Sequence, residues 1–319
     1  MVERGPSSTA LEVTRRAYRW AALAVGVMAM STGSILVRLA QAPPLVQGAW
    51  RLVLASILLA PWAVPRLVRE RKGLSRGDLV MLCLSGAALA LHLAAWMSSL
   101  FYTIVASSVI LVSTNPIYVA LASHHLLGER VGKRRVLAIV VAVVGSVIVS
   151  YGDLRLSGEA LLGDAMALLG ALAMSAHILL GRVVRPKLST LAYVWPCYGL
   201  AGLLMVIPCV ASGQPLVGYG HNTLLMLLLL AIVPQMVGHS TFNWALGHVS
   251  PILVTLAILG EPVGASILAW LVLGEVPPLA AMVGGPMILA GIYLASKDEP
   301  ALGPGHDDLL KGAHDIRQL

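Results

Sequence analysis

Two related segments of the chain decide its fold. The first, NPIYVALASHHLLGE, occupies residues 115–129, and the second, EPVGASILAWLVLGE, occupies residues 261–275. Both place a proline second and close on Leu-Gly-Glu, and they stand 146 residues apart. The same spacing pairs Gly145 with Gly291 further along the chain. A register that holds over this distance predicts an internal duplication.

The duplication extends upstream of both segments at a spacing of 144 residues. There Gly26, Met30, Ser31 and Arg38 pair with Gly170, Met174, Ser175 and Arg182. We expect five helices in each copy, and an odd number requires the second copy to lie upside down in a membrane. Inverted repeats of this kind are a recurring plan of secondary transporters, because two copies of one shape give inward-open and outward-open states of similar energy.

The composition supports a membrane protein. Hydrophobic residues make up 58% of the 319 residues and charged residues only 12%, whereas an ordinary soluble domain is about half apolar and about a quarter charged. A spanning helix needs about 20 mostly apolar residues. The sequence predicts ten of them, at residues 18–39, 46–64, 79–98, 103–123, 135–151, 163–181, 191–211, 223–242, 250–273 and 278–296.

The basic residues predict the orientation. With both termini in the cytoplasm, the inner segments carry nineteen of the 22 Lys and Arg residues, as the positive-inside rule requires. We therefore read the net charge of +7 as a topology signal rather than a nucleic-acid surface. The predicted organisation is a cytoplasmic tail (1–17), a first repeat (18–151), an outer linker (152–162), a second repeat (163–296) and a cytoplasmic tail (297–319), all at the cell (cytoplasmic or inner) membrane.

A family resemblance rests on these motifs. Its residues are the segments Pro116–Glu129 and Pro262–Glu275, Arg51 with the following Leu52–Pro61, and Ser99–Ala106. Over residues 18–296 the chain resembles EamA-type proteins of the drug/metabolite transporter superfamily. The resemblance implies an all-α fold with two inverted five-helix repeats around a central cavity, and alternating access. Members of this kind export amino acids, other metabolites or drugs, and the motif does not select among these substrates.

Glu261 is the sharpest candidate for function, since ionisable residues inside a membrane are costly and usually functional. Pro262 beside it removes a backbone donor and can kink or unwind the helix. A carboxylate beside broken backbone is suited to a proton or a substrate amine; the alternative is a buried glutamate that caps the break. Asn115, its partner in the repeat, cannot titrate. Pro116 and Pro262 are the expected gating positions.

Polar stripes predict the lining of a substrate cavity. Gln235, His239 and Asn243 follow one another at four-residue spacing and so share a helix face, while Ser85, His92 and Ser99 repeat every seven residues. Beside Asn115 and Glu261, the predicted lining residues are His92, Trp96, Ser31, Ser34, His177, Gln235, His239 and Asn243. The alternative is that these side chains form hydrogen bonds between packed helices.

Arg38 and Arg51 flank a short turn expected at the outer surface. Two cations there can attract a carboxylate, but such arginines more often extend to the lipid headgroups, which is the interpretation that the sequence favours. Arg182, the repeat partner of Arg38, fits that interpretation because it ends a predicted helix at the cytoplasmic side.

The sequence holds no His-Glu-x-x-His zinc motif, no Gly-x-Ser-x-Gly elbow and no complete P-loop. We therefore expect no catalytic residues, no metal and no cofactor. The predicted partners are a small-molecule substrate and the lipid bilayer, with no nucleic acid; coupling to protons and a monomer or homodimer stay open. The leading hypothesis is an exporter of a small metabolite, first an amino acid or a related compound. The alternatives are drug or cation efflux by the same fold, and a membrane-embedded lipid-modifying enzyme, which would need clustered acids.

Overall fold

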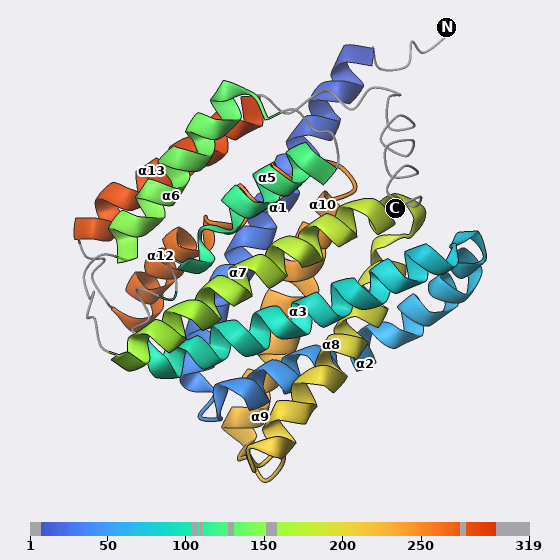
Figure 1. The fold of residues 1–319 in the computed structure, drawn as a ribbon, viewed down its shortest axis with the longest axis vertical. Helices are drawn as coiled ribbons and strands as arrows, with labels where there is room; N and C mark the ends of the chain where they lie inside the picture. Colours follow the sequence, from blue (N-terminus) through green and yellow to red (C-terminus); the bar gives the residue numbers. More distant parts are fainter. Residues whose placement is uncertain are drawn as a thin grey trace, which may run out of the picture.

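A computed structural model describes residues 8–103, 108, 111–126, 131–150, 158–274 and 279–297. The described residues are helical, with turns and short loops between the helices and no strand among them (Figure 1). The elements are α1 (Ser8–Leu39), α2 (Pro44–Glu70), η1 (Arg71–Gly73), α3 (Arg76–Tyr102), α5 (Asn115–Leu126), α6 (Lys133–Ser150), α7 (Gly158–Val184), η3 (Arg185–Lys187), α8 (Thr190–Ala211), α9 (His221–Leu230), η4 (Ala231–His239), α10 (Ser240–Ala245), α11 (Pro251–Ile258), α12 (Glu261–Leu273) and α13 (Leu279–Lys297).

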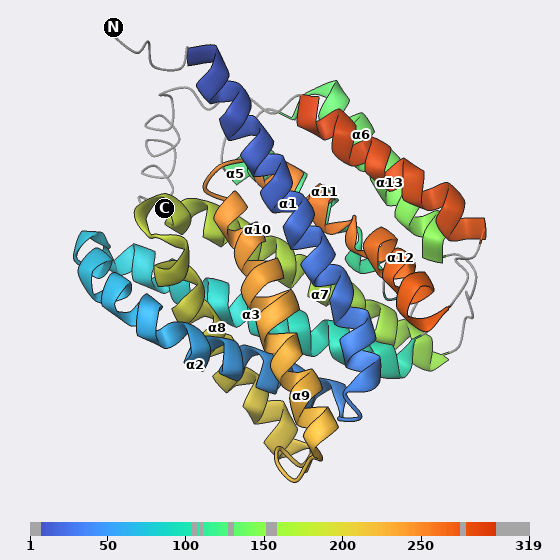
Figure 2. The same ribbon diagram turned by 180° about the vertical axis from the view of Figure 1, so that it is seen from behind.

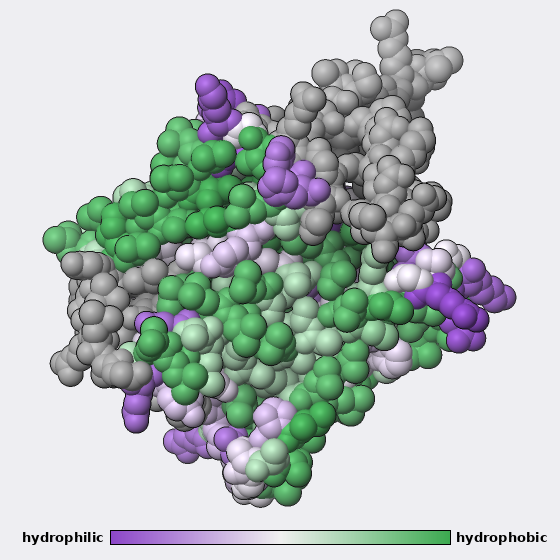
Figure 3. All heavy atoms as spheres, in the orientation of Figure 1, coloured by the Kyte–Doolittle hydropathy of each residue, from purple (hydrophilic) through white to green (hydrophobic). Residues whose placement is uncertain are grey.

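The described helices suit a bilayer. Seven helical stretches among the described residues are long and apolar enough to cross a membrane. Large apolar side chains lie on their outer surfaces, for example Leu203, which is 67% exposed, and Ile57, which is 62% exposed. In Figure 3 such residues cover most of the visible face, and hydrophilic residues gather at its ends, as at the turn between α2 and α3. The chain is a multi-pass helical membrane protein.

Two of the predicted spans are interrupted. The span predicted at 250–273 divides at Leu259 and Gly260 into α11 and α12, and the span predicted at 103–123 has a turn at residues 113–114 before α5 begins. Pro116 and Pro262 are the second residues of α5 and α12. A proline is tolerated there because the first turn of a helix has no partner for its N–H groups. Each proline thus starts a half-helix near the middle of the fold.

The helices pack in pairs that are distant in sequence. α3 lies along α7 and α6 along α13 (Figure 1), and α1 lies along η4 and α10 when the molecule is seen from behind (Figure 2). α2 packs against α8 and η4. Because η4 is a π-helical segment within the rod formed by α9, η4 and α10, its side chains are rotated relative to those of a regular α-helix.

The α6–α13 contact depends on two glycines. A Cβ added at Gly145 of α6 would lie 2.7 Å from the carbonyl oxygen of Gly284, and one added at Gly291 of α13 would lie 2.7 Å from that of Ala138. Real side chains do not approach a backbone oxygen so closely, so each glycine lets the opposite backbone come near. Gly145 and Gly291 are the pair that the duplication predicts at equivalent places.

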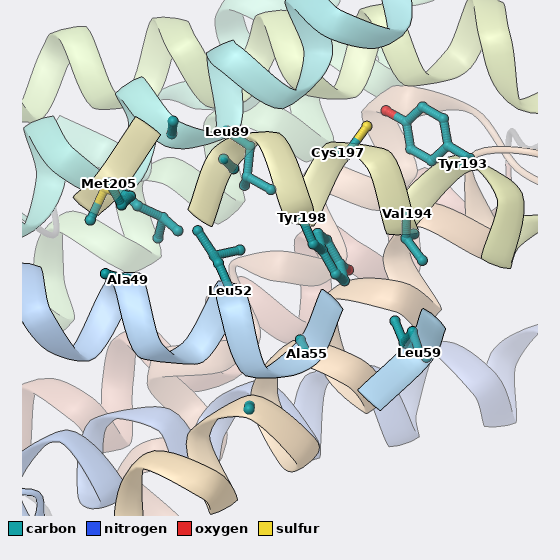
Figure 4. Packing of buried hydrophobic residues seen from close by; sticks show 14 of the residues in the cluster. Ala49, Leu52, Ala55, Leu59, Leu89, Tyr193, Val194, Cys197, Tyr198 and Met205 are labelled. Atoms are coloured by element: carbon teal, nitrogen blue, oxygen red, sulfur yellow. The ribbon is translucent and has the colours of Figure 1, made fainter. Parts of the chain in front are cut away.

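An apolar cluster joins α2, α3 and α8. Leu52, Leu89 and Met205 are fully enclosed in it (Figure 4), and the tyrosines of α8, Tyr193 and Tyr198, have no exposed surface. The shared apolar packing among these three helices fixes the rotation of α2 and α8 about their axes. It therefore decides which of their polar side chains face the interior.

Polar contacts tie the helix ends together. Ser75 caps α3 in a capping box with Asp78, and the Oδ1 atom of Asp78 lies 2.7 Å from Nζ of Lys187, in the turn between α7 and α8. At the opposite end of α3, Thr103 donates a hydrogen bond of 2.8 Å to Asp164 of α7. α3 and α7 are therefore antiparallel neighbours.

Candidate functional site

Arg51 lies at the centre of the polar interior. Its side chain is 6% exposed, and Nε donates a hydrogen bond of 2.6 Å to Oε1 of Gln235 in η4. The sequence favoured an arginine that extends to lipid headgroups, and this prediction is wrong for Arg51. The packing of α2 against α8 and η4 turns the side chain inward, where a buried amide oxygen accepts from it.

Two nitrogen atoms of this pair have no partner. Because Nε of Arg51 can only donate, the bond fixes the amide of Gln235 with its oxygen toward the arginine. Nη2 of Arg51 and Nε2 of Gln235 are then buried donors without a hydrogen-bond partner among the described residues. Buried polar groups are normally satisfied, so two buried donors without a partner need an explanation.

Charged and aromatic groups from other helices surround Arg51. Glu261 at the start of α12 and Tyr198 of α8 are close enough to interact with it electrostatically. His92 of α3 and His239 of η4 are also within electrostatic reach. Both Arg51 and Glu261 lie in the described part of the chain, and no ion pair within 4 Å joins them there. Two opposite charges thus face the same interior without touching.

The helix that begins at Glu261 is held by a serine of α1. Oγ of Ser31 lies 3.1 Å from the carbonyl oxygen of Glu261 and 2.8 Å from that of Val27. Gly264 allows this approach, because a Cβ at that position would lie 2.9 Å from Cβ of Ser31. Ser31, predicted to line a cavity, therefore fixes the start of α12 against α1.

The helix that begins at Asn115 is held in the same way. Oγ of Ser175 on α7 lies 3.3 Å from the carbonyl oxygen of Asn115 and 2.8 Å from that of Ala171. Ser175 and Asn115 are the residues that the duplication pairs with Ser31 and Glu261. Oδ1 of Asn115 is buried and has no hydrogen-bond partner among the described residues.

His92 and Trp96 lie between α3 and α7. Nδ1 of His92 is 2.9 Å from the carbonyl oxygen of Gly170, and the two aromatic rings are parallel with centroids 6.2 Å apart. A Cβ added at Gly170 would make only ordinary van der Waals contact, 3.4 Å from the Trp96 backbone nitrogen, so the packing does not require a glycine there. Through one ring nitrogen, His92 therefore forms a hydrogen bond between the packed helices α3 and α7. The sequence left this role open as the alternative to cavity lining.

His177 belongs to a second polar group, formed by α3, α7 and α8. Nδ1 of His177 lies 2.9 Å from Oγ of Ser85, and the hydroxyl of Tyr193 lies 2.6 Å from the same Oγ atom. Nε2 of His177 is buried without a hydrogen-bond partner in the described structure, although Asn243 is close enough to interact with it. The sequence did not indicate Tyr193, because a tyrosine in an apolar run carries no spacing signal.

The stripe Gln235, His239 and Asn243 faces one interior, as predicted. All three residues are buried, at most 3% exposed. Gln235 reaches Arg51, His239 is within electrostatic reach of Arg51, His92 and His177, and Asn243 lies beside His177. The amide nitrogen of Asn243 donates 2.9 Å to the carbonyl oxygen of His239, one turn earlier.

Two arginines at the end of α7 hold the end of α10. Nη1 of Arg182 donates 2.9 Å to the carbonyl oxygen of Leu246, and Nε of Arg185 donates 2.8 Å to that of Asn243. Carbonyl groups in the last turn of a helix lack internal partners, which is why cations are favoured there. The prediction that Arg182 extends to headgroups is therefore wrong. The side chains of Ser34 and Arg38 lie outside the described residues.

An apolar pocket of about 450 Å³ lies elsewhere, between α5 and α6. Ile117, Leu121, Ile139 and Val143 are among its lining residues, and His124 is its polar member. None of the predicted cavity residues contributes to it. A pocket so poor in polar groups suits an acyl chain better than a polar metabolite.

The fold and its interior define a class of protein: a multi-pass helical membrane protein with buried polar side chains from several helices and two broken spans. The model of the EamA-like transporter family matches the chain twice, at residues 17–151 and 161–297. The chain belongs to the EamA-like transporter family. Transport is thus its general function, and the family and the names of its relatives point away from enzymes, as predicted.

Two relatives agree with this placement, and a solved structure shares the fold. An uncharacterized transporter of Archaeoglobus fulgidus is 26% identical over 86% of this chain and 95% of its own. A protein of Streptantibioticus cattleyicolor named as a probable terminal-alkyne amino-acid exporter is 26% identical over 77% of this chain and 82% of its own. A crystal structure of another protein matches with a TM-score of 0.76 and 17% identity, over 88% of this chain and 96% of that one, and so shares the fold.

Proposed function

We propose that the protein is a secondary transporter that exports a small metabolite, first an amino acid or a related compound, across the cell membrane by alternating access. Ten helices form two inverted five-helix repeats around a central cavity, with both termini in the cytoplasm. The cavity is lined by the polar residues of α2, α3, η4, α10 and α12, and the broken spans at Pro116 and Pro262 serve as gates.

The equivalent serine contacts are the observation that supports this proposal most. Ser31 holds the start of α12, and Ser175 holds the start of α5, each with a second bond to a carbonyl oxygen one turn earlier in its own helix. Two half-helices that begin near the middle of the fold, each docked on the opposite repeat, suit a protein that rocks one unit against the other.

The substrate class draws on two further facts. One relative is named as an exporter of an amino acid, and a buried arginine, Arg51, carries unpaired donors in the interior. Organic cations would meet repulsion from that arginine. An amino acid or another metabolite with an anionic group therefore fits the interior better than a cationic drug.

Counterflow in proteoliposomes tests the proposal. Purified protein is reconstituted with unlabelled amino acids inside, and the uptake of the same labelled amino acids is measured against empty liposomes. Saturable uptake that depends on the internal amino acid supports alternating access. Protein that remains folded in the liposomes but exchanges neither amino acids nor any other labelled metabolite would contradict the proposal.

A further inference from the structure

We propose that Arg51 and Gln235 bind the carboxylate of a zwitterionic substrate and that Glu261 receives its ammonium group. This inference rests on the proposed transport function and names the chemistry of its substrate. It assigns one binding role to each of three side chains, from α2, η4 and α12.

The carboxylate side follows from the orphan donors. Nε of Arg51 is occupied by Oε1 of Gln235 at 2.6 Å, and Nη2 of Arg51 and Nε2 of Gln235 are left as buried donors on the two side chains of this contact. Both atoms can only donate. Neither side chain can turn toward water, because Gln235 has no exposed surface and Arg51 is 6% exposed. The missing partner is therefore an acceptor, and a guanidinium group binds a charged acceptor most strongly.

The ammonium side follows from the unpaired glutamate. Glu261 is within electrostatic reach of Arg51, yet the two groups form no ion pair in the described structure. Opposite charges in a low-dielectric interior attract strongly and normally pair. Here Ser31 and the start of α12 hold the backbone of Glu261 in place. A ligand that carries both charges can satisfy a cation and an anion that are held apart in this way.

The pair of charges excludes simpler ligands. A primary amine has no acceptor for Arg51 and Gln235, and a simple carboxylic acid leaves Glu261 without a partner. An α-amino acid carries a carboxylate and an ammonium group on one carbon and can satisfy both. The side chain of the amino acid takes no part in these contacts.

Binding measurements with matched ligands test the inference. The probes are the proteinogenic L-amino acids, with leucine compared with 4-methylpentanoate and isoamylamine, and phenylalanine with 3-phenylpropanoate and phenethylamine. Isothermal titration of the full-length protein in detergent gives the affinities. We expect each single-charge analogue to bind about tenfold or more weakly than its amino acid. Equal affinity for an amine and its amino acid would overturn the inference, as would a lack of binding by all the amino acids.

Two variants separate the two halves of the site. Gln235→Glu keeps an oxygen for Nε of Arg51 and replaces the orphan NH₂ with an oxygen that pairs with Nη2. The variant should therefore fold, lose affinity for amino acids and carboxylic acids by about tenfold or more, and retain its weak affinity for amines. Glu261→Gln should weaken the binding of amino acids and amines and leave that of the acids unchanged. Gln41→Glu, the same change at an exposed position, is the matched control.

Flux measurements distinguish the failure of this inference from the failure of the proposed function. If Gln235→Glu and the unaltered protein bind and exchange leucine equally well in proteoliposomes, transport stands and the assigned carboxylate site is wrong. If leucine binds as predicted but no labelled compound is exchanged, the site stands and the transport function fails.

Discussion

The starts of α5 and α12 are alike in backbone and different in chemistry. In both, a proline is the second residue of the half-helix, and a serine of a helix in the other half lies 3.1 to 3.3 Å from the carbonyl oxygen of its first residue. In α12 that first residue is Glu261, which is partly exposed and lies within electrostatic reach of Arg51. In α5 it is Asn115, 2% exposed, with an unpaired Oδ1. The duplication thus preserves the scaffold, while the charge is present on one side only.

Under the proposed function, this difference gives the two halves separate tasks. A serine hydroxyl bonds the backbone carbonyl group of the first residue of each half-helix, whatever the side chain of that residue is. Both halves can therefore keep this contact. A charged binding site needs a single arrangement of opposite charges. We therefore expect the loss of either serine hydroxyl to act alike in both halves, and changes to the side chains of the first turns of α5 and α12 to act unequally.

We expect the largest change in the free energy of unfolding at the position where the first turns of α5 and α12 differ in the space available for a side chain. Gly264→Leu would force a side chain into Ser31, so we expect the free energy of unfolding to fall by about 3 kcal/mol. The equivalent position in α5 is Tyr118, and Tyr118→Leu should have a much smaller effect. Thermal unfolding in detergent, followed by size-exclusion chromatography, measures both. Equal loss of folded protein in the two variants would refute the steric difference.

Removing the charge difference comes next. Glu261→Asn gives both half-helices the same first residue, and we expect exchange of an amino-acid substrate to fall about tenfold or more while the protein remains folded. Asn115→Ala removes an acceptor that has no partner, so exchange should change by less than about twofold. Counterflow in proteoliposomes is the measurement. A greater loss from Asn115→Ala than from Glu261→Asn would reverse the assignment.

The smallest effect is expected from removing the serine contacts that the starts of α5 and α12 have in common. Ser31→Ala and Ser175→Ala each remove one hydroxyl bonded to backbone carbonyl groups, and each should lower the free energy of unfolding by about 1 kcal/mol. Because the two serine hydroxyls bond different carbonyl groups, the double variant should show the sum of the single effects. Strongly unequal effects in thermal unfolding would show that the two starts are not equivalent.

Sequence patterns predicted which polar side chains of a single helix are buried. The spacing of Gln235, His239 and Asn243 predicted a shared inward face, and the prolines predicted the interruption of two spans. The sequence gives the position of Arg51 along α2 but not the rotation of that helix. For this reason the prediction placed the side chain of Arg51 at the lipid headgroups. The tyrosines of α8 gave no signal for a similar reason: a hydroxyl in an apolar run becomes polar lining only when a partner such as Ser85 lies opposite.

The sequence by itself determined that the protein lies in a membrane, which family it belongs to, and where its two equivalent proline segments are. Composition and repeated spacing can be read along the chain without knowledge of how the chain folds. Only the tertiary structure decided that Arg51 meets Gln235 and lies within electrostatic reach of Glu261, two residues that follow it in the chain by 184 and 210 positions. The physical reason is packing. The apolar cluster of α2, α3 and α8 fixes the rotation of α2, and Ser31 with Gly264 fixes the start of α12. Together these contacts bring the buried guanidinium group of Arg51 and the partly exposed carboxyl group of Glu261 within electrostatic reach, without an ion pair between them.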